Sequence, residues 1–451
     1  MNKLNYKEIN DFSTGSILGH MLRLAAPMTL AQLVNVLYNI VDRIYIGMLP
    51  QNAKLAMTGL GVCLPICTIT IAFANLIGMG GAPLFSIQRG ARNDDEAESI
   101  LGNSFVLLII FGILLSIVGF IVKKPALYLL GASDATFGYA NSYISIYLVG
   151  TVFVTLSLGL NSFINAQGFA KMGMLTVAIG AVVNIILDPI LIFGAKMGVE
   201  GAALATIISQ MIAAIWTLKF LLGNQTIVKI KRSKLRLNFK RVMKILGLGL
   251  SGFTMAITNS VVVMVCNSNL QFYGGDIYIG AMTVINSIRE IIMMPIQGIT
   301  GSAQPIISFN YGAKRNDRVK LVIKYMAIAL LIFTGVAWVA TLVFAKQFIM
   351  IFIRDSELIR IGVPVMNIYF FGFFMMAFQF IGQATFTALG KSKQAIFFSL
   401  LRKVFIVVPL IYILPQLGFG VNGVFWAEPI SNFIGGIACF STMYFIVYKR
   451  L

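Results

Sequence analysis

Gly198-Val-Glu-Gly201 recurs later in this chain as Gly420-Val-Asn-Gly423. Three other landmarks recur with the same shift in residue number, which we call the repeat offset: Gly90-Ala-Arg92 with Gly312-Ala-Lys314, Gly168 with Gly390, and Ser209 with Ser431. Chance can supply one such match, but a constant offset over four landmarks is typical of an internal duplication. The sequence therefore predicts two structurally similar halves.

The stretches between these landmarks are long and apolar. The 451-residue chain is 58% hydrophobic and 11% charged, whereas soluble domains carry roughly 25% charged residues. Continuous apolar runs of about 20 residues suit membrane helices, and they lack the alternation of membrane β-strands, whose segments are about 10 residues long. We expect an all-α polytopic membrane protein with twelve spans, approximately at residues 22–47, 56–84, 100–122, 137–160, 172–194, 200–222, 244–272, 277–307, 321–344, 359–388, 395–414 and 421–447.

The formal net charge of +19 comes from Lys and Arg residues that fall mainly in the short loops between the spans. Most of them follow even-numbered spans, which predicts that those loops and both termini are cytoplasmic. This distribution orients a chain in the membrane, so we do not expect nucleic acid as a partner. The segment from Lys346 to Arg360 also carries acids and is expected to be a solvated outer loop. The long first apolar run does not resemble a cleavable signal peptide.

The longest basic stretch lies near the middle of the chain and predicts the domain division. Residues 1–225 and 244–451 are the expected six-helix lobes, and residues 226–243 the cytoplasmic basic linker. An even number of spans in each half makes the two repeats parallel. Transporters built in this way hold substrate between their halves, and each lobe already provides a partner for the other, so we expect a monomer.

Residues for enzymatic or ATP-driven chemistry are not apparent. The single histidine, His20, lies at the expected cytoplasmic entry to the first span, and Cys63 and Cys67 lack further zinc ligands. No Walker-type loop is present. We therefore expect neither an enzyme nor a cofactor other than a coupling ion.

Five ionisable residues fall inside the predicted spans, where each costs about 2.5–3.5 kcal/mol on insertion scales. None has a charged counterpart at the repeat offset, so the duplicated fold does not require them. They are better explained by a functional site. The five residues are Asp42, Asp188, Arg289, Glu290 and Glu428, and their counterparts are Met264, Leu410, Cys67, Thr68 and Thr206.

Polar residues in the first span follow one helical face. They are Gln32, Asn35, Tyr38, Asn39 and Asp42, at steps that bring them together along a helix. This face is expected to contact protein or water rather than lipid.

Asn184 and Asp188 share one face of the fifth span. Asp42 and Asp188 lie roughly 25–29 Å from their cytoplasmic ends at about 1.5 Å per residue, so they can share a layer. Two buried acids that lie close together bind a proton more readily, or with neighbouring oxygens they can hold a hard cation. The alternatives are an ion pair or interfacial cap that involves Asp42 and Arg43 near the outer end of the helix, and an Asp188 carboxyl that satisfies backbone groups freed by Pro189.

In the second half, Glu428 is followed directly by Pro429, as Asp188 is followed by Pro189 in the first half. Glu290 adjoins Arg289, but adjacent residues point to different sides of a helix. The two acids can line an anionic cavity for cationic substrates, or they can neutralise Arg289 and Arg402. The sequence leaves both readings open.

Several motifs resemble those of multidrug and toxic compound extrusion (MATE) transporters, in particular the DinF-like and MepA-like branch. The first span carries Leu22-Arg-Leu-Ala-Ala-Pro27 and Tyr38-Asn-Ile-Val-Asp42-Arg-Ile-Tyr-Ile-Gly47. The later motifs are Gln88-Arg-Gly-Ala-Arg92, Asn165-Ala-Gln-Gly-Phe-Ala170, Asn184-Ile-Ile-Leu-Asp188-Pro189 and Gly198-Val-Glu-Gly-Ala-Ala203. The resemblance covers nearly the whole chain and implies a V-shaped, two-lobed antiporter of twelve helices.

The resemblance also implies a cation-binding site in the N-terminal lobe. Asp42, Asn184 and Asp188 match its acid and its Asn/Asp pair, and make a Na⁺ site at these three residues a further expectation. Tyr38 matches the first-helix motif, Asn161 and Thr206 are looser placements, and Pro27 matches a proline linked to helix bending in some members. The NorM-like branch has an acid on the seventh helix, but none occurs between Leu246 and Leu270. A NorM-type site in the C-terminal lobe is therefore not expected.

Together these features predict a secondary active efflux antiporter of a prokaryotic cytoplasmic membrane, which exports organic, mostly cationic amphipathic compounds in exchange for H⁺ or Na⁺. Gln32, Asn35, Asn39, Arg289, Glu290 and Glu428 are the candidate lining of its substrate cavity. The alternative is a lipid-linked oligosaccharide flippase of the same superfamily, which would more naturally present a basic cavity to pyrophosphate. A membrane enzyme or receptor without transport is the third reading, with Arg289 and Glu290 as its best candidates.

Overall fold

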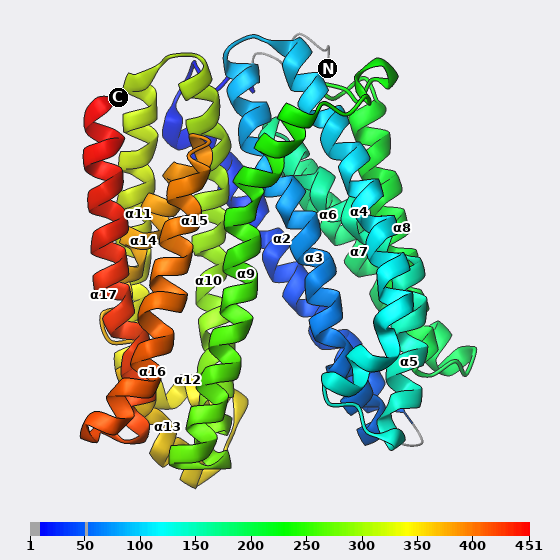
Figure 1. The fold of residues 1–451 in the computed structure, drawn as a ribbon, viewed down its shortest axis with the longest axis vertical. Coiled ribbons are helices and arrows are strands. Elements are labelled where there is room, and N and C mark those ends of the chain that lie inside the picture. The colour runs from blue at the N-terminus through cyan, green and yellow to red at the C-terminus, as the bar shows by residue number, and fades with distance from the viewer. Residues whose placement is uncertain (1–9, 50–52) are drawn as a thin grey trace. The chain divides into compact units, whose positions relative to one another are not determined.

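The computed structural model describes residues 10–49 and 53–451, and these ranges contain helices but no β-strand (Figure 1). The helices of the first half are α2 (Ile17–Gly47), α3 (Ala53–Gly90), α4 (Asp94–Leu129), α5 (Asp134–Val149), α6 (Thr151–Ala166), α7 (Ala170–Pro189) and α8 (Val199–Leu222). Those of the second half are α9 (Phe239–Gly274), α10 (Asp276–Gly312), α11 (Asn316–Val343), α12 (Ala345–Phe352), α13 (Ser356–Tyr369), α14 (Met376–Ala388), α15 (Ser392–Leu400), α16 (Val408–Leu414) and α17 (Val421–Ile446).

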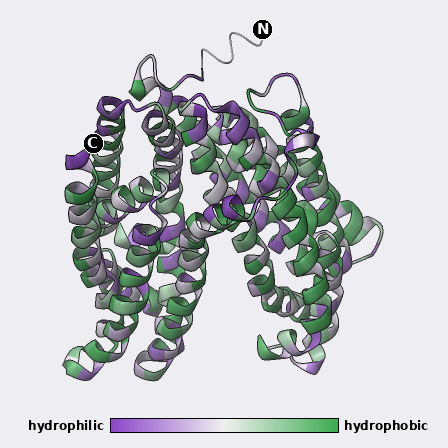
Figure 2. Cartoon of the chain, turned by 45° about the horizontal axis from the view of Figure 1, so that its top comes forward, coloured by the Kyte–Doolittle hydropathy of each residue, from purple (hydrophilic) through white to green (hydrophobic). Residues whose placement is uncertain are grey.

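Within the described ranges, ten helices are long and apolar enough to cross a membrane, and the number rises to twelve if each of two bent helix pairs is one span. α5 and α6 meet at 57°, and α13 and α14 meet at 41°. Each of the twelve predicted spans coincides with one of these segments, so the predicted polytopic helical fold is confirmed. Figure 2 shows hydrophobic residues along most helices and hydrophilic residues gathered near many of their ends.

The two bent pairs break at equivalent places. Gly150 separates α5 from α6, and Gly372 precedes the 3₁₀ turn η3 (Phe373–Met375) between α13 and α14. These two glycines are related by the repeat offset. Gly372 has a φ of +65°, a region that glycine adopts without steric cost. The interruption is therefore part of the duplicated architecture.

The repeated landmarks also share their backbone conformation. Arg92 and Lys314 have φ values of 58° and 57°, and Gly198 and Gly420 have 55° and 54°. Positive φ is uncommon for residues other than glycine, so an Arg and a Lys with nearly identical values at equivalent positions are informative. The predicted internal duplication is confirmed at the level of the chain path.

The repeated motif Gly198-Val-Glu-Gly201, which recurs as Gly420-Val-Asn-Gly423, has a packing role in both halves. It begins α8 and α17, and its second glycine lies against the end of the preceding helical segment. A Cβ atom would lie 2.7 Å from the carbonyl carbon of Leu191 at Gly201, and 2.6 Å from the backbone nitrogen of Pro415 at Gly423. Any side chain at either position would clash with backbone atoms.

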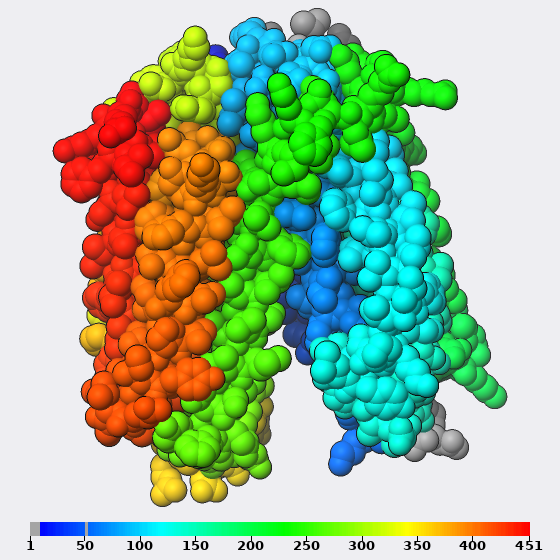
Figure 3. Space-filling view, viewed as in Figure 1, coloured from blue at the N-terminus to red at the C-terminus, as the bar shows by residue number. Residues whose placement is uncertain are grey.

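The chain divides into two compact units. The first contains Ala26–Gly249 with the described part of the segment before Gly15, and the second contains Gly15–Ala25 with Leu250–Leu451. The division therefore falls within α2, just before Pro27. Within the second unit, α16 packs against α17, and the two are visible side by side in Figure 3.

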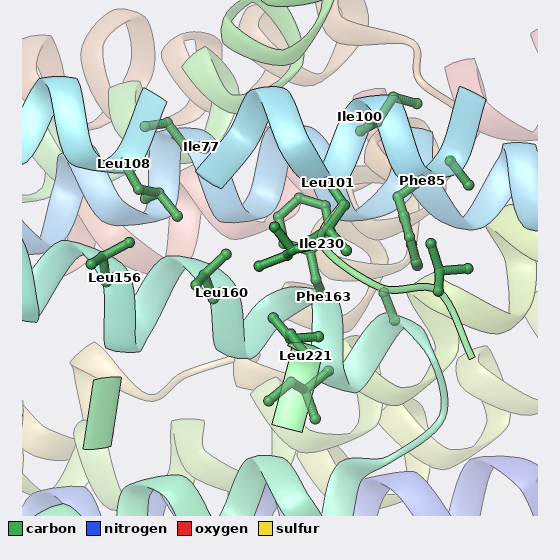
Figure 4. Packing of buried hydrophobic residues seen from close by; sticks show 14 of the residues in the cluster. Ile77, Phe85, Ile100, Leu101, Leu108, Leu156, Leu160, Phe163, Leu221 and Ile230 are labelled. Carbon is green, nitrogen blue, oxygen red and sulfur yellow. The ribbon is translucent and has the colours of Figure 1, made fainter. Parts of the chain in front are cut away.

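The first unit is built around a large apolar core. Its members come mainly from α3, α4, α6 and α8, and Figure 4 shows their interdigitated side chains. Phe85 and Phe163 meet edge to face with ring centroids 5.5 Å apart. Burial of each such aromatic side chain stabilises the fold by roughly 1.5–3 kcal/mol. This packing fixes the helices that carry the polar residues of the unit.

The basic segment that follows α8 is part of the first unit and is hydrogen-bonded to its helices. The Gln167 side-chain oxygen accepts hydrogen bonds from the backbone N–H groups of Ile227 and Val228, at 3.0 and 2.8 Å. The Asn103 side chain donates to the carbonyl of Arg236 at 2.9 Å and accepts from the N–H of Asn238 at 3.0 Å. The segment expected to be a linker is thus held by buried amides, while the proposed domain boundaries at residues 225 and 244 stay a prediction.

The expected solvated loop from Lys346 to Arg360 is largely helical. α12 occupies Ala345–Phe352 and α13 begins at Ser356, which leaves only a short connection between them. Ala345 and Ile349 are buried one turn apart, so an apolar face favours the short helix over a solvated loop. The segment connects two spans and its charged residues are exposed, as expected, but most of it is helical rather than irregular.

Candidate cation-binding site

The polar face of α2 ends at Asp42. The Asp42 side chain is half-buried, and its Oδ1 atom is fully buried without a hydrogen-bond partner. Gln32, Asn35 and Tyr38 are also half-buried, whereas Asn39 is exposed and donates its amide N–H to the carbonyl of Asn35 at 2.6 Å. Asn39 therefore serves its own helix, and Asp42 is the residue of this face with an unmet bonding capacity.

α7 contributes Asn184 and Asp188, which are 1% and 0% exposed. The Asn184 amide donates to Oδ1 of Asp188 at 3.3 Å. The side-chain amide oxygen of Asn184 (Oδ1) and the Oδ2 atom of Asp188 remain buried without hydrogen-bond partners. Asp188 is also close enough to Asp42 to interact with it electrostatically. The two acids that the sequence placed in one layer thus lie within electrostatic range of each other.

Neither alternative for these acids is supported by an ion pair or a hydrogen bond. Among the described residues, no salt bridge links Asp42 to the adjacent Arg43, although the two charges interact. Asp188 uses its one bonded oxygen for Asn184 rather than for backbone groups near Pro189. Both carboxylates therefore keep an oxygen free for a further ligand.

The walls around Asp42 include residues that sequence reasoning missed. Cys67 of α3 and Tyr143 of α5 both lie within electrostatic range of Asp42, and the Tyr143 side chain is hydrogen-bonded with Thr206 of α8. Tyr147, one turn from Tyr143, stacks with it at a centroid distance of 6.4 Å. The two tyrosines at a four-residue spacing were a detectable signal. Thr206, a looser placement in the prediction, does share this polar environment.

Asn161 lies elsewhere in the same unit. A Cβ atom on Gly173 of α7 would lie 3.0 Å from Asn161 Oδ1 and 2.3 Å from Asn165 Oδ1, so both amides face that glycine. Gly173 lies about four helical turns before Asp188, or about 22 Å along the helix. The structure therefore does not bring Asn161 to the two acids. Both amide oxygens are nevertheless buried and unpartnered.

Pro27 is buried inside a continuous α2. Proline has no backbone N–H, so it cannot donate the usual helical hydrogen bond to the carbonyl one turn earlier. The missing hydrogen bond weakens α2 locally, close to the point between Ala25 and Ala26 where the helix is divided between the two units.

The first-unit acids and their neighbours form an acceptor-rich site. Asp42, Asn184 and Asp188 each bury an oxygen with no donor, and each unmet group costs about 1–3 kcal/mol. A proton converts a carboxylate into a donor, and a hard cation accepts carboxylate and carbonyl oxygens as ligands. No group of three or more His, Cys, Asp or Glu residues suited to a metal occurs in the described ranges. Two acids with neutral oxygens fit a proton or a monovalent cation.

Charged residues of the second unit form a different arrangement. Glu428 of α17 accepts from Arg402 Nη1 at 2.9 Å and from Lys403 Nζ at 3.3 Å, while Arg289 Nη1 lies 3.8 Å away. Of the two readings left open for Glu428, the contacts show the neutralisation of basic residues. Glu290, by contrast, is exposed and has no ion pair among the described residues.

The two arrangements occupy equivalent places. The repeat offset relates Arg289, Tyr369 and Glu428 to Cys67, Tyr147 and Thr206, all of which surround Asp42 or its neighbours. The tyrosine is common to both units. The remaining positions are neutral in the first unit and charged in the second.

Comparisons with known proteins agree with this duplicated architecture. The MatE family profile matches twice, at residues 27–190 and 251–413, so the two matches are separated by nearly the repeat offset. The multidrug export protein MepA of Staphylococcus saprophyticus is 25% identical over 96% of this chain and 95% of its own. The protein of the same name from Staphylococcus haemolyticus is 26% identical over 97% and 95%. A MATE protein crystallised in the straight conformation shares the fold, with a TM-score of 0.91, 22% identity, and coverage of 98% of this chain and 99% of that one.

Proposed function

Because the chain belongs to the MatE family, and its relatives include multidrug export proteins, we propose that it is a secondary active antiporter. It exports organic, mostly cationic amphipathic compounds in exchange for H⁺ or Na⁺. The coupling ion binds in the first unit at Asp42, Asn184 and Asp188, with Tyr38 and Thr206 nearby.

One observation carries this proposal: three buried oxygens, one on each of Asp42, Asn184 and Asp188, have no donor. Carboxylates in a low-dielectric interior are costly to keep charged and unpaired. Binding of H⁺ or a monovalent cation satisfies both the charge and the empty lone pairs. Buried acceptor oxygens on two acids favour the binding of H⁺ and of Na⁺ alike.

Coupling follows from competition for the same charge. An organic cation and the driving ion both favour ionised carboxylates, so occupancy by one lowers the affinity for the other. Exchange also requires that the driving ion favour one conformation over another, because a ligand shifts an equilibrium only by its differential affinity. α2 and α7, which carry the acids, are the elements that this binding biases.

We place the protein in a prokaryotic cytoplasmic membrane with both termini in the cytoplasm. The support is the concentration of Lys and Arg in the loops after even-numbered spans. The organic cations then enter from the side of the basic loops and leave on the opposite side.

The direct test is transport by the purified chain in proteoliposomes, with pH and Na⁺ gradients imposed separately. Ethidium flux is expected with at least one gradient, and Asp42→Asn is expected to abolish it. Asp276→Asn is a matched control, because Asp276 is an exposed acid in the first turn of α10. Normal flux in Asp42→Asn, with expression intact, contradicts the proposed site.

The flippase alternative gains one observation, the cluster of Arg289, Arg402 and Lys403 in the second unit. It gives no role to the paired acids of the first unit, and the curated relatives above are export proteins. A chain that scrambles lipid-linked pyrophosphates in vesicles but leaves ethidium gradients unchanged would reverse this preference.

A further inference from the structure

The second unit contains a pocket bordered by α9, α10, α13, the π-helical segment η4 (Leu401–Val407), α16 and α17. Arg289, Lys403 and Glu428 line it together with Asn286 and Tyr369. We call it the basic pocket. All of its residues belong to the second unit, and it shares none with the site at Asp42, Asn184 and Asp188.

The charges around the basic pocket do not balance. Three cations, Arg289, Arg402 and Lys403, surround the single carboxylate of Glu428, and the exposed Glu290 acts on Arg289 only through its charge. Buried charges without partners are strongly unfavourable. Even with Glu290 counted, basic side chains outnumber acidic ones around the pocket, which favours the binding of an anion.

Glu428 is bound most closely by the cation outside the pocket lining. Arg402 Nη1 lies 2.9 Å from Glu428 Oε1 and 2.7 Å from Asn432 Oδ1, so its charge and geometry are well satisfied. The two lining cations are held more loosely. Lys403 Nζ is 3.3 Å from both carboxylate oxygens, and Arg289 Nη1 is 3.8 Å from the nearer one.

The lining cations also have unused donors. Arg289 Nε is buried without a hydrogen-bond partner, while Nη1 donates to the Tyr369 hydroxyl at 3.2 Å. An ammonium has three N–H donors and a guanidinium has five. Both contacts of the Lys403 ammonium lead to the same carboxylate. The pocket thus offers donors and positive charge, where the site in the first unit offers acceptors.

Local backbone geometry contributes to this arrangement. Arg402 and Lys403 are consecutive, yet both side chains contact Glu428. They lie at the start of η4. Segments of this kind are rare and frequently occur at functional sites. In the first unit the equivalent residues, Gly180 and Ala181, lie in regular α7 and carry no charge.

We propose that the basic pocket binds an oxyanion, the carboxylate or phosphate group of a ligand with an apolar body. Arg289 and Lys403 hold the charged group, and Val262, Ile411 and Val424 of the lining contact the apolar part. Guanidinium and ammonium groups bind such oxyanions through charge-assisted hydrogen bonds. This site goes beyond the proposed cation exchange, which does not require it.

Two sources supply this chemistry: a soluble amphiphile, or the headgroup of an anionic phospholipid. We would measure binding calorimetrically to the purified full chain in phosphatidylcholine nanodiscs, with hexanoate and hexyl phosphate as soluble probes and hexylammonium as the control. A second arm compares nanodiscs with and without phosphatidylglycerol, with lipid retention read by native mass spectrometry. Binding of either soluble anion assigns a soluble ligand. Retention of phosphatidylglycerol alone assigns a lipid headgroup.

Variants locate the binding. Arg289→Gln and Lys403→Gln are each expected to weaken anion binding by at least about tenfold, as loss of one charge-assisted contact predicts. Arg289→Lys retains the charge and is expected to recover part of the affinity. Lys346→Gln, an exposed lysine of α12, is the matched control. Glu428→Gln removes the competing carboxylate, so it is expected to bind hexanoate more tightly than the unaltered chain.

The outcomes separate this proposal from the proposed antiport. Asp188→Asn is expected to retain anion binding even where cation-coupled flux is lost. The proposal is overturned if neither the soluble anions nor phosphatidylglycerol bind. It is equally overturned if binding persists unchanged in both Arg289→Gln and Lys403→Gln. If phosphatidylglycerol is not retained and both soluble anions bind no better than hexylammonium, the binding is apolar partition alone, which also refutes the proposal.

Discussion

Where the first unit has Cys67 and Thr206, the second unit has Arg289 and Glu428, on helices that follow the same path. The site at Asp42, Asn184 and Asp188 contains acids and unpartnered acceptor oxygens, whereas the basic pocket contains basic groups and an unpartnered donor on Arg289. The φ values of Gly198 and Gly420 are nevertheless 55° and 54°. The duplication has preserved the backbone while the polar side chains have diverged to opposite charge.

This contrast teaches that the ionisable residues are not part of what the fold needs. Met264 and Leu410 occupy the positions of Asp42 and Asp188 in a unit that folds in the same way. Exchange of residues between equivalent positions is therefore a direct way to separate structural from functional roles.

The largest effect is expected when the first unit receives the residues of the second. Asp42→Met and Asp188→Leu remove the proposed ion ligands, so ion-driven ethidium flux in proteoliposomes is expected to fall to the level of protein-free vesicles. Stability is expected to hold or to rise by about 1–3 kcal/mol, because an unsatisfied buried acceptor is removed. Retained coupling in both variants would show that the acids do not carry the ion.

The reverse exchange in the second unit is expected to be a stability defect. Glu428→Thr leaves Arg289, Arg402 and Lys403 without their shared carboxylate. Loss of one partner from a buried ion pair destabilises by about 3–5 kcal/mol. Unfolding in detergent, followed by circular dichroism, measures this change. An unaltered midpoint would mean that water already screens the three cations.

A smaller effect is expected for the hydrogen bonds of the Gln167 side chain, which have no equivalent in the second unit. Gln167 holds the segment after α8, and its equivalent, Leu389, has no amide. Gln167→Leu leaves the N–H groups of Ile227 and Val228 without their acceptor, for a loss of about 1–3 kcal/mol. Hydrogen exchange should accelerate at those two amides, while Leu389→Gln should not protect the second unit. An unchanged rate of hydrogen exchange at the Val228 amide would argue against a stabilising role for these hydrogen bonds.

The smallest effect is expected at the surface of the first unit. Lys231 Nζ lies 2.6 Å from Glu98, but 52% of the lysine side chain is exposed. Lys231→Gln is therefore expected to change stability by less than about 1 kcal/mol, and added salt should shrink the difference further. A loss that salt does not reduce would indicate a role beyond simple charge pairing.

Several of these features were accessible from the sequence because they depend on periodicity. The spans follow from apolar length, the duplication from a fixed offset, and the approach of Asp42 to Asp188 from similar depth. The break at Gly150 was not predicted, although its repetition as Gly372 was visible at the same offset. Local pattern does not reveal a bend that arises from packing between helices.

Other features depend on contacts between distant segments. The approach of Tyr143 to Asp42 is set by how α5 and α2 pack in one unit, and the position of Asn161 opposite Gly173 by the contact of α6 with α7. The shared contact of Arg402 and Lys403 with Glu428 involves the π-helical segment η4. The four-residue spacing of Tyr143 and Tyr147 shows that they share a helical face, but no spacing in the sequence predicts which segments of the chain these side chains contact.

The close backbone approach at Gly201 and Gly423 has a consequence for genetic variation. Every substitution at either position adds a Cβ atom where backbone atoms already lie. A saturation library selected for expression should therefore show intolerant positions that recur at the repeat offset. The same library selected for drug survival should add intolerant positions without such a counterpart, for instance Asp42 and Asp188. Each map of intolerant positions can be compared with itself after a shift by the repeat offset. Positions that coincide are required by the duplicated fold, and positions that do not coincide are required by transport.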